Sequence, residues 1–235
     1  MRQQDPTQSL AGSDIIARLP GDIRDEFVGK CRVKAYLPRE HMCFPGDAVP
    51  GPTWVVRGLS SSCRLGPAGG EMPARFIWPG DLFIVSFVGH LDWTGQLTAI
   101  THTELAYIPE AAFNELCARS AELAIAWTSL LSDHMRIRMG REARLRGLHL
   151  RPRMLKLLGA IADTFGTATP EGILLDFPLT QGTLCCGLWS SRDETGRAMR
   201  DLESNGYLQT RPRHRILIPN RVRLDEYVAG VSTRA

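Results

Sequence analysis

The sequence predicts an α+β fold in three successive parts: an antiparallel β-roll over residues 1–121, a long helix over 122–149 and a winged helix-turn-helix over 150–235. Three observations favour this order. Short apolar runs separated by Pro and Gly fill the first part, as is typical of antiparallel strands joined by turns. Residues 122–150, which follow, contain no Pro and can form one long helix. The last part has two helix starts close together, and then two short β-like runs around a basic tip.

Composition and charge limit the function classes. A chain of 235 residues with 43% hydrophobic and 23% charged residues is long enough for one or two buried cores. It has no apolar run long enough to span a bilayer and no apolar signal core at its start, so we expect a cytoplasmic protein with no membrane partner. Residues 134–235 hold 17 of the 28 Lys and Arg residues but 10 of the 25 Asp and Glu residues. This imbalance favours a C-terminal part that binds nucleic acid.

The N-terminal part is predicted to begin with a helix and to continue as strands. Residues 14–34 have an amphipathic pattern that indicates a helix. The strands are expected in the runs VKAYLPREHMCFPGDAV, TWVVRGLSSSCRLG, ARFIWPGDLFIVSF and QLTAITHTELAYIP. No glycine-rich loop of the P-loop type occurs among them, and no catalytic constellation of Ser, His and Asp, of paired carboxylates or of zinc ligands can be assembled. The protein is therefore not expected to be an enzyme.

Residues 122–150 are predicted to form one long helix, of about 40 Å at 1.5 Å per residue. Apolar and aromatic side chains recur along it in steps of three and four, which is typical of a seam between paired helices. The seam consists of Leu123, Trp127, Leu130, His134 and Ile137. The length favours pairing with a second copy, and the alternative is a helix packed on its own β-roll. Arg151-Pro152-Arg153 then begins a helix over 151–165, followed by a loop over 166–170.

Residues 179–203 are predicted to form two helices joined by a tight turn. Thr180 is expected to cap the first helix and Ser191 the second, while Asn205-Gly206 ends the second. At about 100° per residue, the face with Thr195, Ala198, Met199 and Leu202 can pack on a core. The opposite arc carries Arg192, Asp193, Gly196, Arg197 and Arg200.

That arc has the chemistry of a helix that reads DNA in the major groove. Arginine donates to guanine O6 and N7, and a carboxylate accepts from cytosine N4. The basic tip that follows is expected to contact phosphates and carries Arg211, Arg213, His214 and Arg215. The alternative is an ordinary helical hairpin with a solvated charged face.

This segment resembles the Crp/Fnr family of bacterial transcription regulators, whose motif reads roughly T-x-x-x-[LI]-[AG]-x-x-x-G-x-S-R-E-T-x-x-R. Thr180, Leu184, Ser191, Arg192 and Arg197 match it at the right spacing, and Asp193 stands at the family's Glu. The resemblance implies that Arg192, Asp193 and Arg197 read bases. It implies a homodimer on double-stranded DNA, paired through the long helix, and contact with RNA polymerase. The backbone contacts we expect are Thr180, Ser191, Arg200, Arg211, Arg213 and Arg215.

Two residues depart from the motif. Trp189 stands where the family has a turn Gly, and a Trp fits poorly at positive φ, so we expect a distorted turn. Glu194 replaces the Thr after the acidic position and puts a negative charge where a phosphate contact is common. These departures keep a second function open: a ligand-, haem- or redox-sensing protein of the same fold with altered or lost DNA binding.

The N-terminal part is similar to the cyclic-nucleotide-binding β-roll of the same family. The matching segments are Tyr36-Leu37-Pro38, Pro45-Gly46-Asp47, Val55-Val56-Arg57-Gly58, Pro79-Gly80-Asp81-Leu82 and 98–105. Members that bind cyclic AMP grip its phosphate with an Arg beside a Ser or Thr, and the corresponding positions here fall near Trp93 and Thr94. Asp81 is the candidate for the ribose-binding Glu. No Arg occurs between Arg75 and Arg119, so we predict no cyclic nucleotide binding of the usual kind. Haem or another small effector remains open in this pocket.

The six cysteines suggest further hypotheses. None precedes Cys31, which argues against the N-terminal iron–sulfur cluster of some family members. His41 and Cys43 could ligate a metal or haem, although two incidental side chains on a strand are the better-supported reading, so no metal site is predicted. Cys185 is expected to face the second helix of the motif, and Cys186 to lie nearer the surface. Oxidation of either thiol would add bulk or charge close to DNA, whereas the alternative is that both are small buried residues.

Overall fold

The computed structural model describes residues 3–4, 6–10, 12–65, 71–82 and 95–232, and it divides the chain into two compact units. The first unit comprises 1–71 and 76–138, and the second comprises 72–75 and 139–235. One helix, α5 (Ala121–Arg146), runs from the first unit into the second. In the part of the chain that the structure describes, no helix combines the length and the apolar character needed to cross a bilayer.

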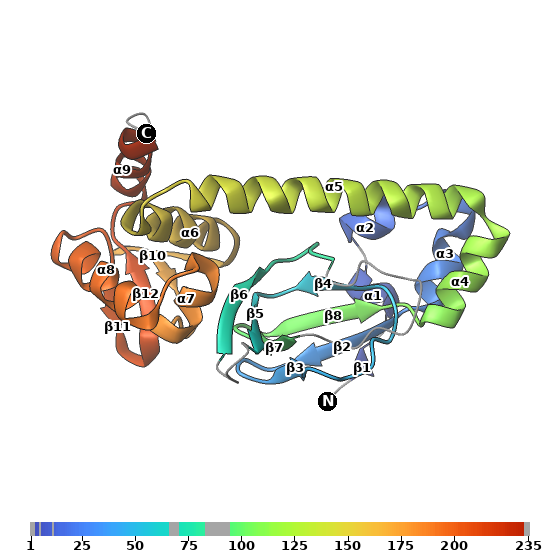
Figure 1. Ribbon diagram of the computed structural model, residues 1–235. Coiled ribbons are helices and arrows are strands. Elements are labelled where there is room, and N and C mark those ends of the chain that lie inside the picture. Colours follow the sequence, from blue (N-terminus) through green and yellow to red (C-terminus); the bar gives the residue numbers. More distant parts are fainter. Residues whose placement is uncertain (1–2, 5, 11, 66–70, 83–94, 233–235) are drawn as a thin grey trace. The chain divides into compact units, whose positions relative to one another are not determined.

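Two four-stranded sheets precede α5 in the described part of the chain (Figure 1). One has the strand order β1-β2-β8-β4, with β1 (Gln3–Gln4), β2 (Arg32–Tyr36), β8 (Thr103–Tyr107) and β4 (Thr53–Arg57). The other has the order β3-β7-β5-β6, with β3 (His41–Cys43), β7 (Gly95–Ala99), β5 (Ser60–Leu65) and β6 (Glu71–Ile77). The pairs with described registers are antiparallel. The predicted β-roll is confirmed.

Helices cover one end of this roll, and they differ from the predicted helix over 14–34. The structure has α1 (Pro6–Leu10), α2 (Asp14–Ala17) and α3 (Gly21–Lys30) between β1 and β2, and α4 (Glu110–Arg119) after β8. Pro20 separates α2 from α3 because it lacks the N–H that a continuous helix would need. Residues 32–34, the end of the predicted helix, belong instead to β2, which pairs with β8 over five positions and lies largely within the predicted strand run from Val33. Sheet pairing therefore overrides the amphipathic pattern there.

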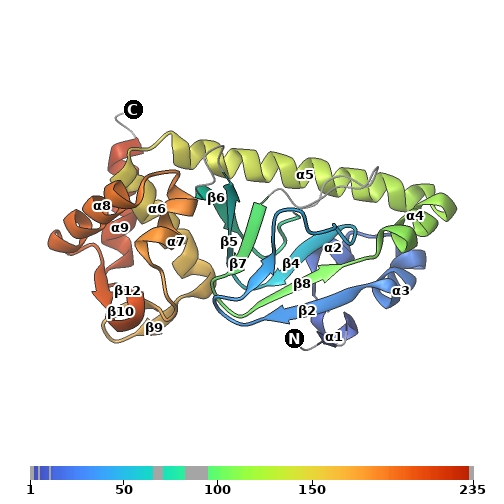
Figure 2. The same cartoon turned by 60° about the horizontal axis from the view of Figure 1, so that its bottom comes forward.

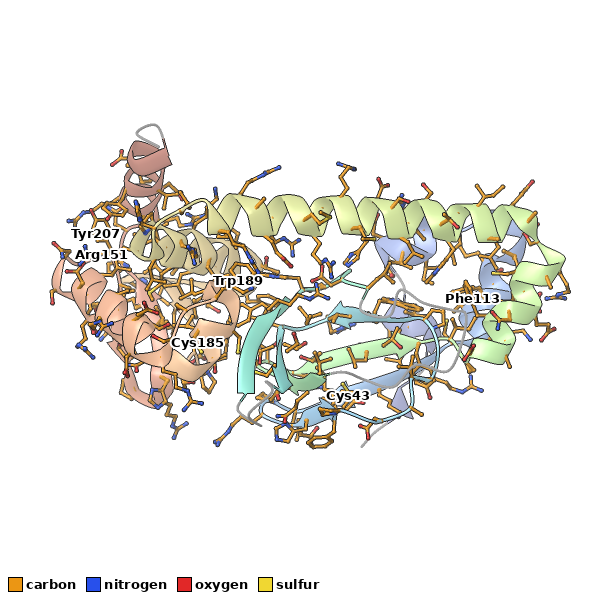
Figure 3. The ribbon with its side chains drawn as sticks, viewed as in Figure 1. Cys43, Phe113, Arg151, Cys185, Trp189 and Tyr207 are labelled. Atoms are coloured by element: carbon orange, nitrogen blue, oxygen red, sulfur yellow. The ribbon has the colours of Figure 1, made fainter. Side chains whose placement is uncertain are left out.

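Four aromatic rings join α5 to the roll and to the other helices. Trp127 of α5 lies 5.1 Å from Phe113 of α4, 5.9 Å from Phe27 of α3 and 6.3 Å from Trp54 of β4, between ring centroids. The side chain of Phe113 lies at the end of the unit where α4 leads into α5 (Figure 3). All four rings are buried. A second buried cluster consists of Tyr36, Cys43, Val55, Ile77, Leu97, Ala99 and Leu105.

The second unit is a winged helix-turn-helix with an added C-terminal helix (Figure 2). Its helices are α6 (Leu150–Phe165), α7 (Gln181–Leu188), α8 (Arg192–Ser204) and α9 (Arg221–Ser232). Its sheet has the order β11-β12-β10-β9, with β11 (Gln209–Arg211), β12 (Arg215–Ile218), β10 (Gly172–Leu175) and β9 (Thr167–Thr169). Residues 167–169, predicted as loop, form β9 because they pair with β10. α9 was not predicted.

Candidate nucleic-acid interface

The first helix of the motif, α7, begins as predicted. The Oγ1 atom of Thr180 accepts a hydrogen bond from the backbone N–H of Thr183 at 3.0 Å, which is an N-cap. Leu184 and Leu188 are fully buried and fix the inner face of the helix. The backbone N–H of Leu179 donates to the carbonyl of His214 at 2.8 Å, so the start of α7 is tied to the wing.

The second helix, α8, begins with a capping box between Ser191 and Glu194. The backbone N–H of Glu194 donates to Ser191 Oγ at 3.2 Å, and the backbone N–H of Ser191 donates to Glu194 Oε2 at 3.0 Å. Two N–H groups that the helix leaves unpaired are thus satisfied. The bonds to Ser191 hold the pKa of the Glu194 carboxyl below its ordinary value. The acidic residue that departs from the family motif therefore stabilises the start of α8.

The two sides of α8 divide as predicted, with one correction. Thr195, Ala198, Met199 and Leu202 are buried, and their opposite arc exposes Arg192, Asp193, Arg197 and Arg200. Gly196, expected on the exposed arc, is buried. A Cβ atom there would stand 2.9 Å from Oε1 of Gln181, so the absence of a side chain lets α7 and α8 approach.

Arg192 and Arg200 line a surface hollow beside α8. The guanidinium of Arg192 lies on Gly182, whose Cβ, if present, would stand 3.3 Å from Nε. The hollow has a volume of about 480 Å³. Its lining also includes Leu179, Thr180, Gln181, Met199, Glu203, Thr210 and His214. Two guanidinium groups, a histidine and the Glu203 carboxylate thus line the hollow between the start of α7, α8 and the wing, and the guanidinium groups suit a phosphate.

The wing is a short antiparallel hairpin whose arginines differ in their partners. Arg215 donates to the carboxylate of Asp176 at 2.9 Å, and Arg211 is paired with Glu171. Arg213 and His214 at the tip are exposed and have φ of 62° and 58°, in the left-handed region. The tip therefore presents Arg213 outward, whereas Arg211 and Arg215 hold carboxylates of the same unit.

Trp189 does not distort the turn between α7 and α8. It takes the left-handed conformation itself, with φ 48° and ψ 46°, and both helices keep their caps. The guanidinium of Arg146 lies 4.5 Å from the centroid of its ring. Trp189 lies at the end of α7 (Figure 3). The predicted distortion is therefore wrong: Trp189 takes the left-handed conformation of the turn, and its ring contacts a cation.

The cysteines give little support to a redox or metal site. Cys185 and Cys186 are each 4% exposed, so the expectation that Cys186 lies nearer the surface is wrong. Their Sγ atoms lie 3.1 Å and 3.6 Å from the carbonyl oxygen of Gly182. Burial raises the pKa of Cys31 and of Cys43 to about 12, which disfavours the thiolate that binds metals. Among the described residues no cluster of three or more metal-binding side chains occurs.

Of the predicted effector-pocket residues, the structure describes one. Asp81 is buried, and its carboxylate accepts from the backbone N–H of Trp78 at 3.1 Å, which closes the Trp78–Asp81 turn. The other two, Trp93 and Thr94, lie outside the described residues. His41, considered as a metal ligand, contacts the Oγ1 atom of Thr98 at 3.0 Å.

The predicted seam of α5 requires a correction. Leu123, Trp127 and Leu130 are at most 3% exposed because they pack in the core of their own unit, and His134 is 9% exposed, so these side chains are not available to a second copy. Ile137 is exposed, but at 100° per residue it lies about 160° from Met139, nearly on the opposite side of the helix. The exposed stripe runs instead through Ile125, Thr128, Ser132, Met135 and Met139.

Sequence reasoning missed α9 and its contacts. Arg221 binds the carboxylate of Asp163 on α6 at 2.9 Å and fits over Gly159, where a Cβ would stand 3.0 Å from its Nη1. Tyr227 packs on Tyr207 at 4.9 Å between ring centroids. Two signals could have predicted this helix: the Asn220 side chain that caps its start, and the buried Leu224.

Comparisons with known proteins identify the fold. No protein-family model matches the chain, and no curated protein sequence does. Solved structures match along most of their length. One is a CRP-family transcriptional regulator from Thermus thermophilus, with a TM-score of 0.68 and 22% identity over 83% of this chain and 96% of that one. Another is the c-di-GMP responsive global regulator CLP of Xanthomonas campestris, with a TM-score of 0.65 and 20% identity over 86% of this chain and 100% of that one.

A third match is FixK2 of Bradyrhizobium japonicum, with a TM-score of 0.62 and 19% identity over 83% of this chain and 96% of that one. The TM-scores of these three matches show that the fold is shared. The chain has the Crp/Fnr-like fold that its motifs predict: a β-roll, a long helix and a winged helix-turn-helix.

Proposed function

From this Crp/Fnr-like fold, we propose that the protein is a transcription regulator that binds DNA sequence-specifically, as a homodimer, on a two-fold-symmetric promoter site. One observation carries the proposal. α8 is capped at its start, buried along one face and lined along the other with Arg192, Asp193, Arg197 and Arg200. A rigid helix with guanidinium and carboxylate groups on its free face suits base reading in the major groove.

The exposure of the side chains supports the residue roles that we propose. Arg192, Asp193 and Arg197 read base edges from the first two turns of α8. Arg200 and Arg213 are exposed and suit the phosphate backbone. We also assign contacts with the DNA backbone to Thr180, Ser191, Arg211 and Arg215. In the free protein, the hydroxyls of Thr180 and Ser191 cap α7 and α8. Arg211 and Arg215 form ion pairs with carboxylates.

The dimer contact that we propose is the exposed stripe of α5. Ile125, Met135 and Met139 are 69%, 41% and 60% exposed, although they are large and apolar. They recur at intervals compatible with the pairing of two helices, with Thr128 and Ser132 between them. A symmetric pair would place two recognition helices about 34 Å apart, one turn of DNA.

The N-terminal roll is proposed to sense a signal, and RNA polymerase to be a partner, as the similarity to Crp/Fnr regulators implies. The effector stays unassigned. The second function, a sensor with altered or lost DNA binding, was motivated by Trp189 and Glu194. Trp189 occupies the turn without disrupting either helix, and Glu194 completes a capping box. Both residues are therefore compatible with DNA binding.

The proposal is tested by selecting duplexes from a randomised DNA library with the purified protein. We expect recovery of a two-fold-symmetric sequence that binds far more tightly than an unrelated duplex of equal length. Arg197→Ala should then cost about 1 to 3 kcal/mol on the selected site and relax the preference at one base position. If the wild-type protein enriches no sequence, the proposed function is wrong. If the variant loses equal affinity on both duplexes, Arg197 contacts only phosphate.

A further inference from the structure

The turn of the helix-turn-helix holds a residue in a conformation that its type rarely adopts. Trp189 has φ 48° and ψ 46°, in the left-handed region where the Cβ atom crowds the backbone. A glycine would adopt this conformation without strain. Such strain persists only where surrounding contacts maintain it, so the indole ring must make contacts that a glycine could not.

The ring contacts the side chain of Arg146, the last residue of α5. The guanidinium of Arg146 lies 4.5 Å from the ring centroid of Trp189, within the range of a cation–π contact. Both residues belong to the C-terminal unit. The end of α5 therefore contacts the turn that immediately precedes Ser191, the N-cap of α8.

A second arginine, Arg153, connects the end of α5 with the end of α7 through hydrogen bonds to backbone carbonyls. Arg153 of α6 donates from Nη1 to the carbonyl of Leu188 at 2.7 Å, at the end of α7. From Nη2 it donates to the carbonyls of Leu148 at 2.8 Å and Arg146 at 3.3 Å, where α5 ends. Its cation thus meets carbonyl groups at the C-terminal ends of two helices, which favour positive charge. Partial burial lowers the pKa of Arg153.

We infer that Trp189, held by Arg146 and supported by Arg153, is a positioning residue that fixes the angle of the recognition helix relative to the end of α5. The inference rests on the proposed function. α5 is continuous from the first unit into the second. A rotation of its last turn would move Arg146, and through the ring it would move the start of α8. The contact acts on base reading through Ser191 and touches no DNA itself.

The test is a double-mutant cycle with Trp189→Gly and Arg146→Ala, measured on the selected duplex and on an unrelated duplex of equal length. Gly suits φ 48°, so Trp189→Gly should fold with a thermal midpoint no lower than that of the wild type. We expect it to lose at least tenfold in affinity for the selected duplex and less than twofold for the unrelated one. Arg146→Ala should lose a similar factor on the selected duplex, and the double variant should lose no more than either single variant.

Arg144→Ala is the matched control, because Arg144 lies in the same last turn of α5 and is exposed. It removes the same charge and should weaken both duplexes by the same small factor. Arg146→Lys keeps the charge and should recover part of the discrimination between the duplexes. The inference is overturned if Trp189→Gly binds the selected duplex as the wild type does, or if the two losses add. Failure of the wild-type protein to discriminate would overturn the proposed function instead.

Discussion

The exposed stripe of α5 leads to a prediction that distinguishes two faces of the same helix, one exposed and one buried. Ile125 is 69% exposed in the single chain, whereas Leu130 is 3% exposed. Full burial of an Ile side chain contributes about 1.5 to 3 kcal/mol, so burying the exposed part contributes about 1 to 2 kcal/mol in each copy. In a two-fold symmetric dimer each copy contributes its own Ile125, so the two side chains together stabilise the dimer by about 2 to 4 kcal/mol. Ile125→Ala should therefore weaken dimerisation roughly 30- to 700-fold.

Sedimentation velocity over a dilution series measures this effect directly as a shift in the dimer dissociation constant. Ile137→Ala is the matched control, since Ile137 is also exposed and apolar but lies nearly opposite the stripe on the helix. It should change the constant less than threefold. Leu130→Ala should instead destabilise the folded chain by about 2 to 5 kcal/mol and leave the dissociation constant of the folded protein near its original value.

Two results would refute this reasoning. If Ile125→Ala dimerises as the wild type does while Ile137→Ala does not, the copies pair through the side of α5 that carries Ile137. If all three variants dimerise like the wild type, the copies pair through another surface. Either result would show that the stripe through Ile125, Met135 and Met139 is not the dimer contact.

Other predictions concern the cap, the effector and the thiols. Ser191→Ala should destabilise the C-terminal unit by about 0.5 to 2 kcal/mol, seen as a lower thermal midpoint. The pKa of Glu194 is lower in the folded protein than its ordinary value of 4.5, so this carboxylate stabilises the fold above pH 4.5, and the stabilisation should be lost as the pH falls through the folded pKa. The test compares the stability of the wild type and of Glu194→Gln as a function of pH. Parallel stability curves would contradict the prediction. Calorimetric titration should detect no micromolar binding of cyclic AMP or cyclic GMP, and such binding would refute the pocket analysis. Mild peroxide should leave DNA affinity unchanged, since Cys185 and Cys186 are buried; a loss that thiol reductant reverses would restore the redox hypothesis.

The local features of the C-terminal unit could be predicted from sequence because each depends on neighbours a few residues away. The caps at Thr180 and Ser191 need only a hydroxyl before a helix, and Gly206 takes the positive φ that ends α8. The buried face of α8 follows from its period. Gly196 was misplaced because its environment is set by Gln181 across the turn, and no periodicity within α8 reports that contact.

The faces of α5 could not be assigned in the same way, because the helix carries two apolar stripes. Leu123, Trp127 and Leu130 make the more apolar one, and a search for a helix-pairing seam selects it first. The same property makes this stripe the better partner for the aromatic rings of Phe27 and Phe113, which come from distant parts of the chain. A helix that packs on its own domain buries its most apolar face there and leaves a weaker stripe for a second copy. Periodicity therefore identified a buried face correctly but could not identify what buries it.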